Sequence, residues 1–227
     1  MNYEIIIFDA DETLFDFNKS ERTAFKNAML DFKIEYDDNH HLKIYHEINK
    51  AIWKEFEEGL ISQEKLKVER FRRLSEKLNA EFDEVEFSKV YMKHLGDACF
   101  LFEESEALVE SLHKDYRLVI VTNGLKEVQT NRIKRSSIAR YFEDVVISDE
   151  VKVAKPDPRI FEIALNNLKH TDKSKVLVVG DSLTSDIRGG INLGVDTCWY
   201  NPGRLTNETE IKPSFEISSL MELKQIL

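Results

Sequence analysis

The sequence has 227 residues, of which 42% are hydrophobic and 33% are charged, a composition typical of a folded globular protein rather than a disordered chain. Its 32 basic and 42 acidic residues give a net charge of −10, which disfavours binding to nucleic-acid polymers and to anionic membranes. A small anionic ligand is still compatible with this charge, because one pocket can be positive or can hold a metal ion.

We expect neither export nor membrane insertion for this sequence. No apolar run approaches the ~20 residues needed to span a bilayer, and the first residues lack the basic region and cleavage site of a signal peptide. Cys99 and Cys198 are too few for a disulfide framework and both have apolar neighbours, so we expect reduced thiols. We therefore predict a cytoplasmic protein without a membrane partner.

Short apolar runs rich in β-branched residues recur along the chain and predict strands that are buried on both faces. They occupy residues 5–8, 118–121, 145–147 and 176–179, with weaker candidates at 197–200 and 215–217. Helix-like stretches of crossover length lie between them, near 125–136, 157–169 and 184–193. This alternation predicts an α/β fold with a doubly wound, mostly parallel sheet.

Residues 17–95 contain no comparable apolar run and predict an all-helical domain inserted after the first strand. Ile44, Ile48, Ile52 and Phe56 lie four residues apart, a spacing typical of a helix with one apolar face. Several such charged helices favour an antiparallel bundle. The predicted domains are an α/β core of residues 1–16 and 96–227 and a helical insert of residues 17–95, with a helix near 103–114 returning the chain to the core.

Polar residues follow four of the predicted strands, at the point where each strand ends. These are Asp9 and Asp11 after the first strand, Thr122 and Asn123 after the second, Lys155 after the third, and Asp181 and Asp186 after the fourth. In an open α/β sheet the ligand site lies outside the carboxyl ends of the strands. We therefore expect these distant segments to converge on one site.

The carboxylates of this set indicate a metal site and a nucleophile. Clustered carboxylates stay ionised together only when a cation holds them, and hard oxygen ligands favour Mg²⁺. Asp9 is then a candidate nucleophile for phosphorus, and Asp11 a candidate general acid and base. Asp9 and Asp181 are expected to bind the metal, with Asp186 either a direct ligand or just behind one.

The remaining polar residues suit a phosphate group. The Thr122 hydroxyl and the backbone N–H of Asn123 are candidate donors to phosphate oxygens, and Lys155 is expected to neutralise charge on the transferring group. Lys155 is preferred to the nearby Lys152 because it directly precedes Pro156. Phosphoryl transfer depends mainly on positioning and charge neutralisation, which this set supplies.

In this order and spacing, the four groups resemble the motifs of the haloacid dehalogenase superfamily. The motifs are Asp9-Ala10-Asp11-Glu12-Thr13, Thr122-Asn123-Gly124, Lys155, and Gly180-Asp181-Ser182 followed by Asp186. The resemblance covers the whole chain and equates residues 17–95 with the helical cap of one branch of the superfamily. It implies an aspartyl-phosphate on Asp9 and a Mg²⁺ ligand from the backbone carbonyl of Asp11. Glu12 stands where the motif usually has Gly, and the stretch Asp-Ala-Asp-Glu-Thr-Leu-Phe-Asp is similar to the pyrimidine 5′-nucleotidase group.

The combined prediction is a Mg²⁺-dependent phosphatase that acts on a small phosphorylated metabolite, a nucleoside 5′-monophosphate with uracil or thymine as its base. A sugar-phosphate phosphatase or phosphomutase on the same scaffold is the main alternative. A dehalogenase needs neither a leaving-group acid nor Mg²⁺, so Asp11 disfavours it, whereas the lysine-rich cap leaves a phosphonatase open. A phosphoacceptor switch of the receiver type has an adjacent acidic pair and no large helical insert, so the Asp-x-Asp spacing disfavours it.

Several further side chains have predictions of their own. Asp16 is expected to be a helix N-cap, and the histidines at 40, 41 and 46 to be solvated, because their spacing does not put two ligands on one helical face. The basic clusters Arg70, Arg72, Arg73 and Arg132, Lys134, Arg135 are predicted to be solvated faces, given the acidic chain. Tyr45, Trp53 and Phe56 have two interpretations, stacking on a base or packing in the helical core, and are left out of the site.

Overall fold

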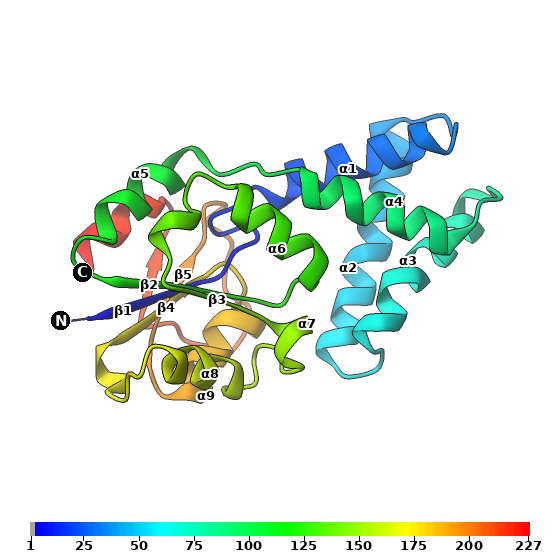
Figure 1. Cartoon of the computed structure of the whole chain (residues 1–227). Helices are drawn as coiled ribbons and strands as arrows, with labels where there is room; N and C mark the ends of the chain where they lie inside the picture. Colours follow the sequence, from blue (N-terminus) through cyan, green and yellow to red (C-terminus); the bar gives the residue numbers. More distant parts are fainter. Residues whose placement is uncertain (1–2) are drawn as a thin grey trace.

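The structure, a computed structural model, describes residues 3–227 and is centred on a six-stranded sheet (Figure 1). The strand order is β3-β2-β1-β4-β5-β6, and every neighbouring pair is parallel. The strands are β1 (Ile5–Phe8), β2 (Arg117–Thr122), β3 (Asp144–Ile147), β4 (Val176–Gly180), β5 (Asp196–Tyr200) and β6 (Phe215–Ile217). The predicted strands and the predicted doubly wound parallel sheet are confirmed.

The central strand β1 shows why these apolar runs form a two-sided sheet. All four of its residues are buried, and side chains alternate between the two faces of a strand. Ile6 and Phe8 enter one hydrophobic core, whereas Ile5 and Ile7 enter the other. A strand that is apolar at every position therefore needs helices on both faces.

Helices cover both faces of the sheet, as the two cores require. Helices α5 (Glu103–Leu112) and α6 (Lys126–Arg135) contribute to the core of one face, and α8 (Arg159–Asn167) and α9 (Arg188–Leu193) to that of the other (Figure 1). A short helix α7 (Ser148–Val151) follows β3. Short helical segments complete the fold at Asp38–Leu42, Ala139–Tyr141, Lys173–Lys175, Leu183–Ile187 and Leu220–Gln225.

The segment between β1 and β2 is helical and extends beyond the carboxyl end of the sheet (Figure 1). Four of its helices, which precede α5, form this extension: α1 (Phe17–Asp31), α2 (Lys43–Glu57), α3 (Gln63–Leu78) and α4 (Glu84–Asp97). They share a third hydrophobic core that is rich in aromatic rings and also includes Leu125 and Val128 from the start of α6. This core continues into the α/β part, so it does not separate two domains. The predicted domain boundaries at 16/17 and 95/96 therefore stay a prediction. We call α1–α4 the cap from here on.

Helix α1 begins at the N-cap that its sequence predicts. Asp16 Oδ1 accepts a hydrogen bond from the backbone N–H of Lys19 at 2.8 Å, so Asp16 is the N-cap of α1, as predicted. This bond fixes α1 directly after the loop that follows β1, and therefore joins the cap to the predicted site.

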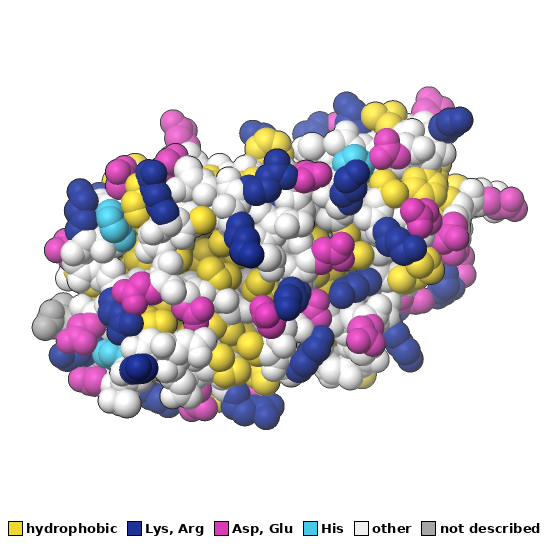
Figure 2. Space-filling model, viewed as in Figure 1, with side chains coloured by type: hydrophobic (Ala, Val, Ile, Leu, Met, Phe, Trp, Pro, Cys, Tyr) yellow, Lys and Arg dark blue, Asp and Glu magenta, His cyan; other side chains and the backbone are white. Residues whose placement is uncertain are grey.

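The outer surface is polar and mixed in charge. On the face drawn in Figure 2, lysine and arginine side chains are interspersed with acidic ones rather than gathered into one patch. Within residues 3–227, no helix combines the length and the apolar character that a membrane crossing requires.

Candidate active site

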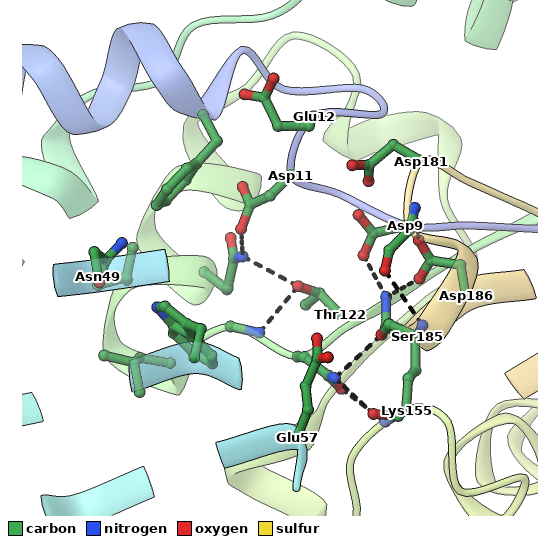
Figure 3. A pocket seen from close by; sticks show the side chains of 18 of the residues that line it. Asp9, Asp11, Glu12, Asn49, Glu57, Thr122, Lys155, Asp181, Ser185 and Asp186 are labelled. Carbon is green, nitrogen blue, oxygen red and sulfur yellow. Dashed lines mark hydrogen bonds and ion pairs between the residues drawn. The ribbon is translucent and has the colours of Figure 1, made fainter. Parts of the chain in front are cut away.

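A cavity of about 490 Å³ lies where the carboxyl ends of the strands face the cap (Figure 3). All seven of the predicted site residues line it from the core side: Asp9, Asp11, Thr122, Asn123, Lys155, Asp181 and Asp186. The cap lines it with Phe17, Asn49, Lys50, Trp53, Glu57, Arg70 and Leu95. The volume falls within the range of about 300–1,000 Å³ that is usual for small-molecule sites.

Lys155 is the buried cation at the centre of the core side. Its Nζ forms ion pairs with Asp9 and, at 2.7 Å, with Asp186 Oδ1, and it donates to the carbonyl oxygen of Val121 at 2.8 Å. Burial lowers the pKa of Lys155, but the charges of Asp186 and Asp9 outweigh this effect and raise the pKa above its usual value. Lys155 therefore carries a permanent positive charge beside Asp9. Lys152, by contrast, has an exposed side chain paired with Asp149.

Three carboxylates meet beside this lysine. Oxygen atoms of Asp9, Asp181 and Asp186 all lie within 4.8 Å of one another. Burial raises the pKa of Asp9 to about 7, with the charges of Asp186 and Asp11 adding to the effect and Lys155 opposing it. Burial also raises the pKa of Asp181, again with Asp186 and Asp9 adding to it. One lysine does not neutralise three crowded carboxylates, and an all-oxygen donor set of this kind fits a hard divalent cation such as Mg²⁺.

This crowding predicts that the site destabilises the metal-free protein. Because the folded pKa values of Asp9 and Asp181 lie above the ordinary value of 3.8, the folded state binds more protons than the unfolded chain. The metal-free protein therefore loses stability as the pH rises from near 3.8 towards about 7, the pKa of Asp9. Asp181→Asn removes one of the repelling charges. It is expected to raise the melting temperature of the metal-free protein at pH 8 by about 2–4 °C, the shift for about 1 kcal/mol in a chain of this size.

Thermal unfolding with and without Mg²⁺ checks this expectation. Mg²⁺ is expected to raise the melting temperature of the wild-type protein, and to raise that of the Asp181→Asn variant much less. A metal-free variant that melts below the wild-type protein at pH 8 would show that Asp181 stabilises the fold and does not strain it.

The loop after β2 is tied to the loop after β3. The Asn123 side chain bonds to the backbone of Lys155 twice. Its Nδ2 donates to the carbonyl oxygen of Lys155 at 2.9 Å, and its Oδ1 accepts from the backbone N–H of Lys155 at 2.8 Å. The Thr122 hydroxyl accepts from the backbone N–H of Gly124 at 3.2 Å and from Gln129 Nε2 at 3.1 Å. The Asn123 side chain thus positions Lys155, a role that the sequence did not predict.

Asp11 lies in the loop after β1, and its carboxylate is directed away from Asp9 (Figure 3). Its Oδ2 accepts from Gln129 Nε2 and its Oδ1 from Arg132 Nη1, both at 2.6 Å. Helix α6 therefore holds the candidate acid and base. The cavity between Asp11 and Asp9 is the place where a leaving group would sit.

The comparison with known proteins decides the family. Residues 3–194 match the model of the haloacid dehalogenase-like hydrolases. The chain belongs to this hydrolase family. The resemblance seen in the four motifs is thus confirmed, and the sheet and cap described above are the fold of the family.

Relatives in this hydrolase family match the chain along its whole length. Pyrimidine 5′-nucleotidase YjjG of Escherichia coli (strain K12) is 35% identical over 227 residues, covering 100% of this chain and 99% of the relative. Pyrimidine 5′-nucleotidase PynA of Streptococcus pneumoniae (strain ATCC BAA-255 / R6) is 35% identical over 228 residues, covering 100% and 96%.

Solved structures of the family share the fold. The structure of the putative hydrolase YfnB from Bacillus subtilis superposes with a TM-score of 0.94 at 32% identity and covers 100% of this chain and 99% of that one. A 2-haloacid dehalogenase from Pseudomonas syringae pv. Tomato has a TM-score of 0.70 at 23% identity, covering 99% and 97%, a likeness that shows the fold alone.

Glu12, the residue that departs from the usual family motif, sits in a tight turn. Its φ of +59° lies in the left-handed region, where Gly is favoured, so the turn explains why the motif usually has Gly there. The Glu12 carboxylate accepts from the backbone N–H and from Nδ2 of Asn18 at 2.8 and 2.7 Å. These bonds to the first turn of α1 offset the unfavourable backbone conformation.

Gly180, in the last motif, allows a close approach. A Cβ atom at this position would lie 2.3 Å from Asp186 Oδ2. The absence of a side chain lets Asp186 lie against the end of β4, where its Oδ2 accepts from the backbone N–H of Ser182 at 3.0 Å. This position leaves the other oxygen of Asp186, Oδ1, free to pair with Lys155.

Two of the arginines predicted to be solvated are buried, so that prediction is wrong for them. Arg132 is 0% exposed and Arg70 is 1% exposed, and both line the cavity. The prediction relied on the net charge of the whole chain, which says nothing about one helix face. Helical spacing carried the missed signal, because Arg132 follows Val128 by four residues and Arg70 precedes Leu74 by four, on the buried faces of α6 and α3. Arg72, Lys134 and Arg135 are exposed, as predicted, and Arg73 is half-buried.

The aromatic residues of the cap differ in their surroundings. Tyr45 is fully buried in the aromatic core of the cap, stacked on Phe25 at 4.4 Å between ring centroids. Trp53 lines the cavity, with Phe56 packed edge-on against it at 5.6 Å. Trp53 therefore belongs to the site, which the sequence left open.

Proposed function

We propose that the chain is a Mg²⁺-dependent phosphatase that hydrolyses pyrimidine nucleoside 5′-monophosphates through an aspartyl-phosphate on Asp9. The observation that carries the proposal is the placement of Asp9, which lies in the cavity between a buried lysine and two further carboxylates. Two full-length relatives are pyrimidine 5′-nucleotidases, and the YfnB structure is bound to magnesium and reveals interdomain movement.

The residues of the site divide the first half of the reaction between them. A bound Mg²⁺, held by Asp9, Asp181 and Asp186, would supply charge neutralisation and orient the phosphate. An oxygen of the Asp9 carboxylate attacks phosphorus, and the bond from phosphorus to the nucleoside 5′-oxygen breaks. Lys155 balances negative charge on the transferring group. Asp11 gives a proton to the departing 5′-oxygen.

The second half regenerates Asp9. A water molecule loses a proton to Asp11 and attacks phosphorus, so that the bond to Asp9 breaks and inorganic phosphate leaves. Thr122 and the backbone N–H of Asn123 donate to phosphate oxygens in both halves. The same carboxyl group, Asp11, serves as acid and then as base because it has lost its proton in the first half.

A substrate panel tests the proposal. Initial rates are measured for UMP, dTMP, CMP, AMP, glucose 6-phosphate and 4-nitrophenyl phosphate, each with Mg²⁺ and with excess chelator. We expect the highest kcat/KM for UMP and dTMP and the loss of all activity with chelator.

Two results would contradict the proposal at different levels. Turnover of glucose 6-phosphate with the nucleotides ignored would reject the nucleotidase and favour a sugar-phosphate phosphatase. A folded sample that leaves even 4-nitrophenyl phosphate intact would reject the phosphatase and favour a phosphoacceptor switch.

A further inference from the structure

Arg70, on α3, is a buried cation on the cap side of the cavity. Its guanidinium packs between aromatic rings, with Cζ 4.9 Å from the ring centroids of Phe71 and Tyr91. Its Nη1 donates to Asn49 Oδ1 at 3.2 Å. Its Nε and Nη2 make no hydrogen bond of ordinary geometry with the described residues; the buried hydroxyl of Tyr45, which interacts with the guanidinium, likewise lacks a well-formed partner. Buried donors without partners are unfavourable and are unusual outside functional sites.

A buried carboxylate of the cap already balances the charge of Arg70. Asn49 Nδ2 donates to Glu21 Oε1 at 2.6 Å, and Glu21 Oε2 pairs with His46 Nδ1 at 2.7 Å. Glu21 is 1% exposed, so the charges of Arg70 and Glu21 face each other across Asn49 inside the cap. A ligand of Arg70 therefore does not need to be an anion, and a neutral oxygen acceptor is sufficient.

Arg70 lies in the part of the cavity that is remote from the phosphate chemistry. Asn49, its partner on α2, is across the cavity from Asp9 and Lys155 (Figure 3). Since Lys155 and the three carboxylates occupy the core side, a bound phosphate monoester would place its phosphate there and its leaving group towards Arg70. Apolar side chains line the cap side of the cavity, among them Phe17, Trp53 and Leu95. Such walls suit a flat ring better than a chain of hydroxyl groups.

We propose that Arg70, held in place by Asn49, binds the nucleobase and donates hydrogen bonds to its carbonyl oxygens. This inference rests on the proposed nucleotidase function. Uracil and thymine each present two carbonyl oxygens, cytosine presents one, and adenine presents none. Arg70 thus favours UMP and dTMP over CMP, and all three over AMP.

The test compares Arg70→Met with a matched variant, Arg73→Met. Arg73 lies on the same helix, but its donors are already paired with Glu55 and Glu69. Arg70→Met is expected to lower kcat/KM for UMP by about 100-fold, the effect of losing a hydrogen bond from a charged donor. Most of the loss is expected in KM, because the base is remote from phosphorus. The rates with AMP and 4-nitrophenyl phosphate are expected to stay within about twofold of wild type, as are all rates of Arg73→Met.

Competitive inhibition by uridine provides a second readout that does not depend on turnover. Arg70→Met is expected to weaken it by the same factor as kcat/KM for UMP. If Arg70→Met does not fold, as judged by its melting temperature, Arg70→Lys replaces it. That variant keeps the buried charge but carries its donors on a single nitrogen instead of a planar fork. Its kcat/KM is expected to fall about tenfold with UMP and to stay unchanged with 4-nitrophenyl phosphate.

The possible outcomes distinguish a failure of this inference from a failure of the proposed nucleotidase function. A wild-type protein that does not prefer UMP to AMP would overturn the nucleotidase proposal and this inference together. A wild-type preference for UMP that survives in a folded Arg70 variant would overturn this inference alone. Equal losses with UMP, AMP and 4-nitrophenyl phosphate would show that Arg70 only supports the cap.

Discussion

Asp9→Asn is expected to abolish phosphate release from UMP and from 4-nitrophenyl phosphate, lowering kcat by about 10⁴-fold or more. The amide oxygen is a poor nucleophile for phosphorus, and the substitution also removes one of the three carboxylates that cluster beside Lys155. The measurement is Mg²⁺-dependent phosphate release at saturating substrate.

The matched control is Asp144→Asn, the same chemical change at the start of β3. Asp144 Oδ2 accepts from Asn167 Nδ2 at 2.8 Å, a contact outside the cavity. This control is expected to keep wild-type rates. Because burial raises the pKa of Asp9, Asp9→Asn is also expected to fold at least as stably as the metal-free wild-type protein. A folded Asp9→Asn variant with a tenth of wild-type activity would exclude Asp9 as the nucleophile.

Asp11→Asn is expected to separate the two halves of the reaction according to the leaving group. With UMP, whose 5′-oxygen needs a proton as it leaves, kcat is expected to fall by about 10²–10⁴-fold. With 4-nitrophenyl phosphate the phenolate leaves without a proton, so the first half stays fast. Hydrolysis of the phosphoryl group on Asp9 stays slow, because the variant lacks the Asp11 carboxylate that takes a proton from water. Rapid mixing is therefore expected to show a burst of nitrophenol equal to the enzyme concentration, followed by slow turnover.

The burst is the diagnostic feature of this variant. Asp11 is held by Gln129 and Arg132, and an amide in place of its carboxylate alters both contacts, so a general loss of structure is checked by melting temperature. Equal losses with both substrates and no burst would show that Asp11 positions groups in the site and transfers no proton.

The sheet and the core side of the site could be predicted because both follow from local sequence patterns. Four consecutive apolar residues at Ile5–Phe8 leave no polar face, so the strand is buried on both sides. Once the strands are parallel, their carboxyl ends share one edge, and Asp9, Lys155 and Asp181 meet there. Only the order of residues along the chain is needed for that argument.

The cap side could not be predicted in the same way. Arg70 and Arg132 are charged residues on otherwise apolar helix faces, and their burial depends on partners far away in sequence, such as Asn49 and Asp11. The prediction that they are solvated failed because composition averages over the chain, whereas burial is decided by one helix face. The bonds from the Asn123 amide to the Lys155 backbone depend likewise on the packing of two loops, which no short motif encodes.

The covalent intermediate on Asp9 is the claim on which the account depends most. The direct measurement is peptide mass spectrometry of Asp11→Asn, quenched in acid during turnover of 4-nitrophenyl phosphate with Mg²⁺. The account predicts one phosphoryl group, located on Asp9 and absent when chelator replaces Mg²⁺. A phosphoryl group on any other side chain, or an unmodified Asp9 during a burst of nitrophenol, would contradict it.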